Sequence, residues 1–158
     1  MSRKIDVQII IGSKSDEVKI KDAIDILAEF DVAYDFKVAS AHRSPSYVEE
    51  IIDNAIDLGA KVFVTGAGMA NHLSGCVASR TTLPVIGIPF SGGVSGGMDS
   101  LLSTVQMPPG IPVATVAIDG AKNGAILAIE ILSIENKELQ KKILEYRNKE
   151  ATKIKNAV

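Results

Sequence analysis

The sequence contains no tryptophan, and aromatic residues make up only 4% of its 158 residues. Its single cysteine, Cys76, excludes an intramolecular disulfide and a cysteine-based metal cluster, which is typical of the reducing cytoplasm. The formal net charge of −2 provides no basic field for a phosphate backbone, so we expect no nucleic-acid partner. The run at 7–11 is far shorter than a membrane span, so we expect no membrane partner and a cytoplasmic location.

What is present fits an ordinary globular enzyme or binding module. Hydrophobic residues make up 46% of the chain and charged residues 23%, which argues against disorder and fibrous structure. The length is close to the commonest domain size, so we expect residues 1–158 to form a single domain. The 13 glycines predict several close backbone approaches in an aliphatic core.

Hydrophobic periodicity alternates between two and 3.6 residues along the chain. It predicts strands at 5–11, 34–39, 61–65, 85–88 and 112–118, and helices at 16–30, 45–58, 71–80, 99–104, 121–132 and 136–157. Regular alternation of this kind predicts an α/β fold with a parallel sheet and helices on both of its faces. The glycine-rich segment 89–98 is the one long connection and a candidate site element.

The final predicted helix is polar and carries only a thin apolar stripe. The stripe consists of Leu139, Ile143, Tyr146 and Ile154. A helix with so narrow an apolar face needs a partner surface, which we expect a neighbouring subunit to provide.

The loop after the first strand, residues 12–16 (GSKSD), combines two hydroxyls with the start of a helix. Ser13, Ser15 and free N–H groups at a helix N-terminus favour an anion, and the pattern lacks the glycine spacing of dinucleotide and triphosphate loops. It predicts a monophosphate site. The simpler alternative is that Ser15 only caps the helix and Asp16 lies in its first turn.

The loop after the second strand, residues 40–45 (SAHRSP), places a histidine beside an arginine. Ser44 and Pro45 suit a helix start, which leaves His42 and Arg43 unexplained by local structure. A group that titrates near neutrality next to a permanent cation suits proton transfer beside a phosphate. A solvent-exposed pair without function is the alternative.

The loop after the third strand, residues 66–75 (GAGMANHLSG), is rich in small residues that let backbone amides approach a ligand. Gly66 and Gly68 could equally serve only to turn the chain, with Asn71 capping a helix. The strand ends in Thr65 and Gly66 rather than an acceptor aspartate, which excludes a response regulator. His42 and His72 lack helical ligand spacing and an acidic cluster, so we expect no metal.

Taken together, these motifs resemble the N5-carboxyaminoimidazole ribonucleotide mutase family over almost the whole chain. The resemblance rests on residues 12–16, 40–45, 66–68 and 72–73, on 99–103 (DSLLS) and 106–108 (QMP), and on 110–115 (GIPVAT) before an alanine-rich helix. It implies a three-layer α/β/α fold of flavodoxin-like type, assembled as a homo-octamer, with the C-terminal helix (136–157) packed on a neighbouring subunit. It implies no metal and no cofactor.

The same resemblance assigns the site. His42 corresponds to the proton-transfer residue, and the substrate-binding positions are Ser13, Ser15, Asp16, Ser40, Ala41, Arg43, Gly66, Ala67, Gly68, His72 and Leu73. The implied reaction isomerises N5-carboxyaminoimidazole ribonucleotide to the 4-carboxy-5-aminoimidazole ribonucleotide of purine biosynthesis, through release and recapture of CO2. By its position, segment 91–98 is expected to close the pocket against water.

Two departures bear on the subclass. The family usually has Ala-His-Leu-Pro-Gly where this chain has residues 71–75 (NHLSG), and residues 117–121 form a shorter connection than usual. A related subclass carboxylates aminoimidazole ribonucleotide directly with CO2, acting as a lyase, but commonly has lysine at the position of Arg43. Arg43 and His72 therefore favour the mutase. A non-catalytic nucleotide-binding module on the same fold is the second alternative.

Overall fold

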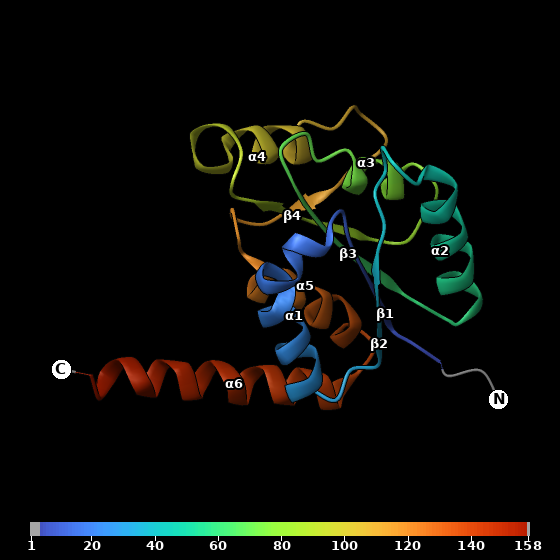
Figure 1. Cartoon of the computed structure of the whole chain (residues 1–158). Helices are drawn as coiled ribbons and strands as arrows, with labels where there is room; N and C mark the ends of the chain where they lie inside the picture. The colour runs from blue at the N-terminus through green and yellow to red at the C-terminus, as the bar shows by residue number, and fades with distance from the viewer. Residues whose placement is uncertain (1–3, 158) are drawn as a thin grey trace.

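The computed structural model describes residues 4–157, which form alternating strands and helices around one sheet (Figure 1). The strands are β1 (Val7–Ile11), β2 (Tyr34–Val38), β3 (Val62–Gly68), β4 (Val85–Phe90) and β5 (Ala114–Thr115). The helices are α1 (Glu17–Glu29), α2 (Pro45–Asp57), α3 (Leu73–Ala78), α4 (Met98–Val105), α5 (Ala121–Ser133) and α6 (Lys137–Lys155), with short 3-10 turns η1 (Lys14–Asp16) and η2 (Val94–Gly97).

All neighbouring strands of the sheet are parallel, in the order β2-β1-β3-β4-β5. The chain steps outward from β1 to β2 and then returns to the other side of β1 to form β3. In sheets of this order a crevice opens at that reversal, beyond the carboxyl ends of β1 and β3. The predicted flavodoxin-like sheet is confirmed.

Helices cover both faces of the sheet, which confirms the three-layer α/β/α architecture. On one face α1 and α5 pack on β-branched strand residues, with Ile20 and Ile129 fully buried against Ile9. On the other face α2 and α3 pack on residues of alternate register, such as Ile10 and Phe63. The alternation follows from the two-residue period of a strand, and both faces are apolar because both are covered.

The predicted strand at 112–118 is much shorter in the structure. Only Ala114 and Thr115 pair with β4, opposite Ile86 and Gly87. Pro112 has no N–H to donate to a ladder, and pairing begins only at Ala114. The chain stays beside β4 through single hydrogen bonds, such as Val116 N to the Gly87 carbonyl at 3.1 Å. Conversely, β3 and β4 run two to three residues beyond the predicted ends.

Three of the four residues in the predicted α6 stripe pack on the apolar core of this same chain. Ile143 is only 8% exposed, and Leu139 and Tyr146 pack against the same core. The second half of α6 projects from the body, as Figure 1 shows, and its Ile154 is 74% exposed. The need for an outside partner therefore applies only to that second half. Within residues 4–157, none of the helices has both the length and the apolar run that crossing a membrane requires.

Candidate active site

A cavity of about 690 Å³ opens at the carboxyl ends of β1, β2 and β3. Eleven of the twelve predicted site residues line it: Ser13, Ser15, Asp16, Ser40, Ala41, His42, Arg43, Ala67, Gly68, His72 and Leu73. Gly66 does not. A Cβ on Gly66 would lie 2.4 Å from Phe90 Cζ, so this glycine makes room for a core phenylalanine.

The loop from β1 to α1 forms the first wall. Ser13 caps η1, because its Oγ accepts a hydrogen bond from the Ser15 N–H at 3.4 Å and lies 2.9 Å from the Ser15 hydroxyl. The capping residue is therefore Ser13, not Ser15. A Cβ on Gly12 would lie 3.2 Å from Ala67 Cβ, so the loops after β1 and β3 meet closely here. Two hydroxyls and the start of a helix thus face one cavity, an arrangement suited to an anion.

The loop from β2 to α2 carries Arg43 across to this wall. Arg43 Nη2 donates to the Gly12 carbonyl at 3.3 Å, and its backbone N–H donates to Ser40 Oγ at 3.2 Å. Ser44 directly precedes α2 at the N-cap position, but its hydroxyl donates to the Ser40 carbonyl at 3.1 Å rather than capping the helix. The guanidinium makes only this one hydrogen bond among residues 4–157. Its remaining donors are available to an anionic ligand.

The two histidines of the chain meet at the edge of the cavity. His42 Nε2 lies 2.6 Å from His72 Nδ1, and the rings cross at 87° with their centroids 4.8 Å apart. A hydrogen bond between two ring nitrogens needs a proton on one and a lone pair on the other, so one ring donates and the other accepts. Sequence spacing could not show this contact, because 30 residues separate the two positions.

One cation of the cavity was missed by the sequence analysis. Lys19, in the first turn of α1, lines the cavity, and its ammonium donates to the Ser91 carbonyl. It also lies 5.7 Å from the centre of the Phe90 ring. Lys19 follows Asp16 by three residues, so helical spacing places both on one face. That spacing is the signal that could have found it.

The charge of Lys19 acts on two carboxylates, Asp16 and Asp119, whose pKa values shift in opposite directions. Burial raises the pKa of Asp16, Lys19 acts to lower it, and Asp119 raises it further. Burial also acts to raise the pKa of Asp119, but the hydrogen bonds from Ser91 and the charge of Lys19 lower it overall. The Ser91 N–H donates to Asp119 Oδ1 at 2.9 Å. Asp119 therefore holds the start of the glycine-rich segment, and Asp16 remains the carboxylate that faces the cavity.

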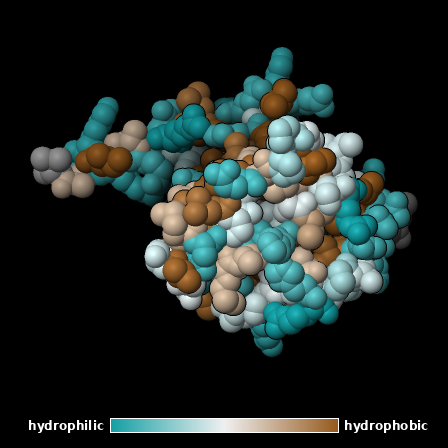
Figure 2. Space-filling view, turned by 90° about the horizontal axis from the view of Figure 1, so that it is seen from above, coloured by the Kyte–Doolittle hydropathy of each residue, from teal (hydrophilic) through white to brown (hydrophobic). Residues whose placement is uncertain are grey.

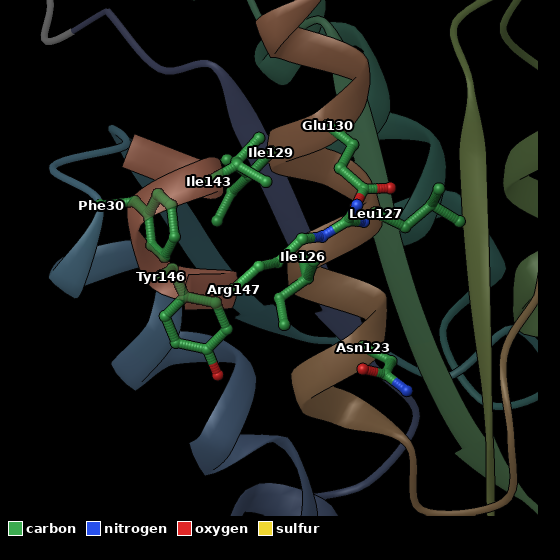
Figure 3. Close-up of a pocket in the computed structure, with 9 residues that line it drawn as sticks. All are labelled: Phe30, Asn123, Ile126, Leu127, Ile129, Glu130, Ile143, Tyr146 and Arg147. Atoms are coloured by element: carbon green, nitrogen blue, oxygen red, sulfur yellow. Dashed lines mark hydrogen bonds and ion pairs between the residues drawn. The ribbon is translucent and has the colours of Figure 1, made fainter. Parts of the chain in front are cut away.

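A second hollow lies between α5 and α6 and has a different character. It has a volume of about 290 Å³ and is lined mainly by apolar side chains such as Phe30, Ile126 and Ile143 (Figure 3). Arg147 pairs with Glu130 at its edge, 2.5 Å apart. No strand-end loop contributes to it, and its ionic groups neutralise each other. Among residues 4–157, no group of three or more His, Cys, Asp or Glu side chains is arranged to hold a metal.

Comparison with known proteins agrees with the fold and the motifs. The family model described as AIR carboxylase matches residues 6–153. The chain belongs to the AIR carboxylase family. The N5-carboxyaminoimidazole ribonucleotide mutase of Methanocaldococcus jannaschii is 52% identical over 146 residues, which cover 92% of this chain and 90% of that protein. The protein of the same name from Bacillus subtilis is 50% identical over 143 residues, covering 89% of this chain and 88% of the relative.

Solved structures of related proteins include PurE of Treponema denticola. A crystal structure of a PurE2 variant from that organism superposes with a TM-score of 0.88 at 29% identity, covering 98% of this chain and 96% of that one. A second structure, PurE of the same organism, gives 0.87 at 30% identity, over 95% and 94% of the two chains. The three-layer fold is thus shared across nearly the full length.

Proposed function

We propose that this chain is an N5-carboxyaminoimidazole ribonucleotide mutase of purine biosynthesis. The observation that carries the proposal is the hydrogen-bonded pair of His42 and His72, which shares a cavity with Ser13, Asp16 and Arg43. A proton-carrying group therefore lies beside an anion-binding wall, as an anionic ribonucleotide undergoing proton transfer requires. Relatives with this name at about 50% identity support the assignment.

Each wall of the cavity suits one part of such a substrate. We assign the phosphate to Ser13 and Arg43, whose hydroxyl and guanidinium are strong donors to a phosphate. We assign the ribose hydroxyls to the Asp16 carboxylate. Ala67, Gly68 and Leu73 would face the base, with Ser15, Ser40 and Ala41 completing the wall around the phosphate and sugar.

The reaction moves one carboxyl group and one proton. The bond between the exocyclic nitrogen and the carboxyl carbon breaks, CO2 is released, and the electron pair left on nitrogen takes up a proton. C4 then attacks CO2 to form a carbon–carbon bond and loses its own proton. The number of protons is unchanged, so a group that delivers one to nitrogen and removes one from C4 suffices. We assign both proton transfers to His42, in the pair with His72.

We assign the enclosure of CO2 to the glycine-rich segment 91–98. Ser91, Gly92 and Gly93 line the cavity, and Ser91 is anchored on both sides by Lys19 and Asp119. Val94 N–H then donates to Asp99 Oδ2 at 3.0 Å, which ties the segment to the start of α4. We propose that the stretch between these anchors excludes water and retains CO2 during the transfer.

The experiment that tests this function compares two carboxyl donors. The purified chain receives either the carbamate at low bicarbonate or aminoimidazole ribonucleotide with abundant CO2, and the C4-carboxylated product is followed. We expect rapid turnover of the carbamate. Efficient turnover from CO2 with no use of the carbamate would assign the chain as the direct carboxylase. Binding of the ribonucleotide without any turnover would make it a non-catalytic nucleotide-binding module.

We also propose that the single domain assembles into a closed homo-oligomer, an octamer by the family resemblance, in the cytoplasm. Leu144 and Ile154 on α6 are exposed, as are Met98, Leu102 and Val105 on α4. The space-filling view in Figure 2 shows apolar side chains interspersed with polar ones on the face seen there, and α6 standing out from the body. Light scattering tests the assembly, and the mass of a single chain would contradict it.

A further inference from the structure

A cluster of polar side chains is buried directly beneath the turn that carries His72. Its members come from β3, from the turn before α3, from α3 itself and from α4. They are Thr65, Asn71, Ser74, Ser100 and Thr104, each no more than 1% exposed. None of them lines the cavity, and every buried polar side-chain atom in residues 4–157 has a hydrogen-bond partner.

The hydrogens in this cluster can be assigned one by one, starting from α4. The Thr104 hydroxyl lies 2.6 Å from the Ser100 carbonyl, which can only accept, so the single hydroxyl hydrogen is used there. Asn71 Nδ2 lies 2.8 Å from Thr104 Oγ1 and must be the donor. The amide nitrogen of Asn71 is therefore fixed toward α4.

The other side of the cluster leads to the same orientation. The Thr65 hydroxyl lies 3.1 Å from the Ile86 carbonyl and 2.8 Å from Ser74 Oγ, to which it donates, and the Ser74 hydroxyl donates to Asn71 Oδ1 at 3.4 Å. Ser74 has then used its hydrogen and accepts from Asn71 Nδ2 at 3.1 Å. Asn71 Nδ2 donates both of its hydrogens, one to the Thr104 hydroxyl and one to the Ser74 hydroxyl, whose own hydrogens are already used in other bonds. An aspartate of the same shape could supply neither hydrogen.

This network fixes the backbone on both sides of His72. The Ser74 N–H, two residues after His72, donates to Asn71 Oδ1 at 3.4 Å, and the His72 N–H donates to the Ala70 carbonyl at 2.8 Å. The Asn71 N–H in turn donates to Ser103 Oγ on α4 at 3.3 Å. The imidazole of His72 thus extends from a turn whose geometry is set by buried bonds to β3 and α4.

Gly87 on β4 provides the space that this arrangement needs. A Cβ at this position would lie 2.5 Å from Thr104 Cγ2 and 3.1 Å from Ser74 Oγ. The strand has no side chain there, so two hydroxyl residues of different helices can approach one point. The close approach lets one asparagine bridge them.

We infer that Asn71, held by Thr104 and Ser74, is a positioning residue that keeps His72 Nδ1 in hydrogen-bonding distance of His42 Nε2. The histidines meet at 2.6 Å with nearly perpendicular rings, a contact that a small shift of the turn would break. The inference deepens the proposed function and rests on it for its effect on turnover. Its structural content, the link from α4 to the histidine pair, is independent of the reaction.

The test replaces Thr104 by valine, which keeps the shape and removes the acceptor for Asn71. We expect kcat to fall by roughly 10- to 100-fold, the scale of a misplacement near 1 Å, with KM changed by less than about twofold because Thr104 lies outside the cavity. Thr104→Ser keeps the hydroxyl and should restore kcat. Ser133→Ala, which removes a buried hydroxyl that bonds to the Glu130 carbonyl on α5, is the matched control and should change neither constant.

A second readout follows the histidine pair directly. The chain has only two histidines, so long-range 1H–15N spectra of their rings in the tag-free protein report this contact alone. Thr104→Val should abolish the signature of the hydrogen bond between the two rings, and Thr104→Ser should keep it. If Thr104→Val fails to fold, Ser74→Ala, which removes the other acceptor, should give the same result.

Three results would overturn the inference: an unchanged ring signature in both variants, an equal loss in Thr104→Ser, or an equal loss in Ser133→Ala. If the unsubstituted chain fails to isomerise the carbamate, the proposed function fails. The ring signature still decides whether Asn71 positions His72.

Discussion

The two faces of the sheet differ in what they bury. Beneath α1 and α5 the core is apolar, with side chains such as Ile9, Ile20 and Ile129 fully enclosed. Beneath α3 and α4 the core includes the hydrogen-bonded cluster around Asn71. Apolar packing is non-directional and tolerates small shifts, whereas a satisfied polar network specifies one geometry. Both faces thus provide stability through apolar packing, and the second in addition fixes the side chains of the site.

The strongest test of the difference between the two faces replaces His42 by asparagine. The side chain lies at the cavity and outside both core clusters, so the fold should remain intact. Turnover should fall by roughly 10² to 10⁴-fold, the usual contribution of a positioned acid–base group. Steady-state assays of the carbamate check this, with ribonucleotide affinity as the control. Near-normal turnover would transfer the proton-carrying role to His72.

Ile129→Ala tests the opposite face. The side chain is fully buried on α5, so its truncation should lower the free energy of unfolding by about 2–5 kcal/mol. Ile129→Val, which removes one methylene, should cost only about 0.5–1.5 kcal/mol. Denaturant titration measures both. We expect turnover per folded molecule to be unchanged, and a loss of kcat without loss of stability would show that this face also positions the site.

Arg43→Ala should act on binding alone. The guanidinium makes one hydrogen bond within residues 4–157, to the Gly12 carbonyl, so little folding energy depends on it. Loss of a charged hydrogen bond to the phosphate should weaken ribonucleotide binding by about 1.5–3 kcal/mol. Titration calorimetry gives the affinity, and Arg43→Lys separates charge from fork geometry. Unchanged affinity in the alanine variant would remove Arg43 from the phosphate site.

The smallest effect we expect comes from Asp16→Asn and depends on pH. Burial raises the pKa of Asp16 in the folded chain, so the folded state holds this proton more tightly than the unfolded state. The group therefore favours folding below its unfolded pKa of 3.8, and this contribution is lost as pH rises through the higher folded pKa. At neutral pH the asparagine variant should be slightly more stable than the parent, and the difference should shrink on acidification. Thermal unfolding at several pH values measures it, and a difference that grows toward acid would contradict the stated sign.

Local patterns were sufficient to predict the loops of the site because each motif directly follows a strand. In a parallel sheet the carboxyl ends lie along one edge, so residues 12–16, 40–45 and 66–73 had to converge. Lys19 was missed because it lies inside a helix, where a lysine is ordinarily a solvated surface residue. Gly66 was assigned to the ligand because a missing side chain can make room either for a ligand or for a neighbouring side chain. Only the packing shows that Phe90 occupies the space beside Gly66.

The sequence by itself determined the order of strands and helices, the parallel sheet and the edge at which the chemistry gathers, because periodicity and strand-end position are local properties. Only the tertiary structure decided the contact between His42 and His72, the burial of Asn71 between β3 and α4, and the packing of the first half of α6 on its own chain. Each of these joins segments that are distant in sequence or depends on which side chains share a buried space. Hydrogen-bond partners inside such a space are set by geometry and by the number of hydrogens available, which residue type alone does not specify.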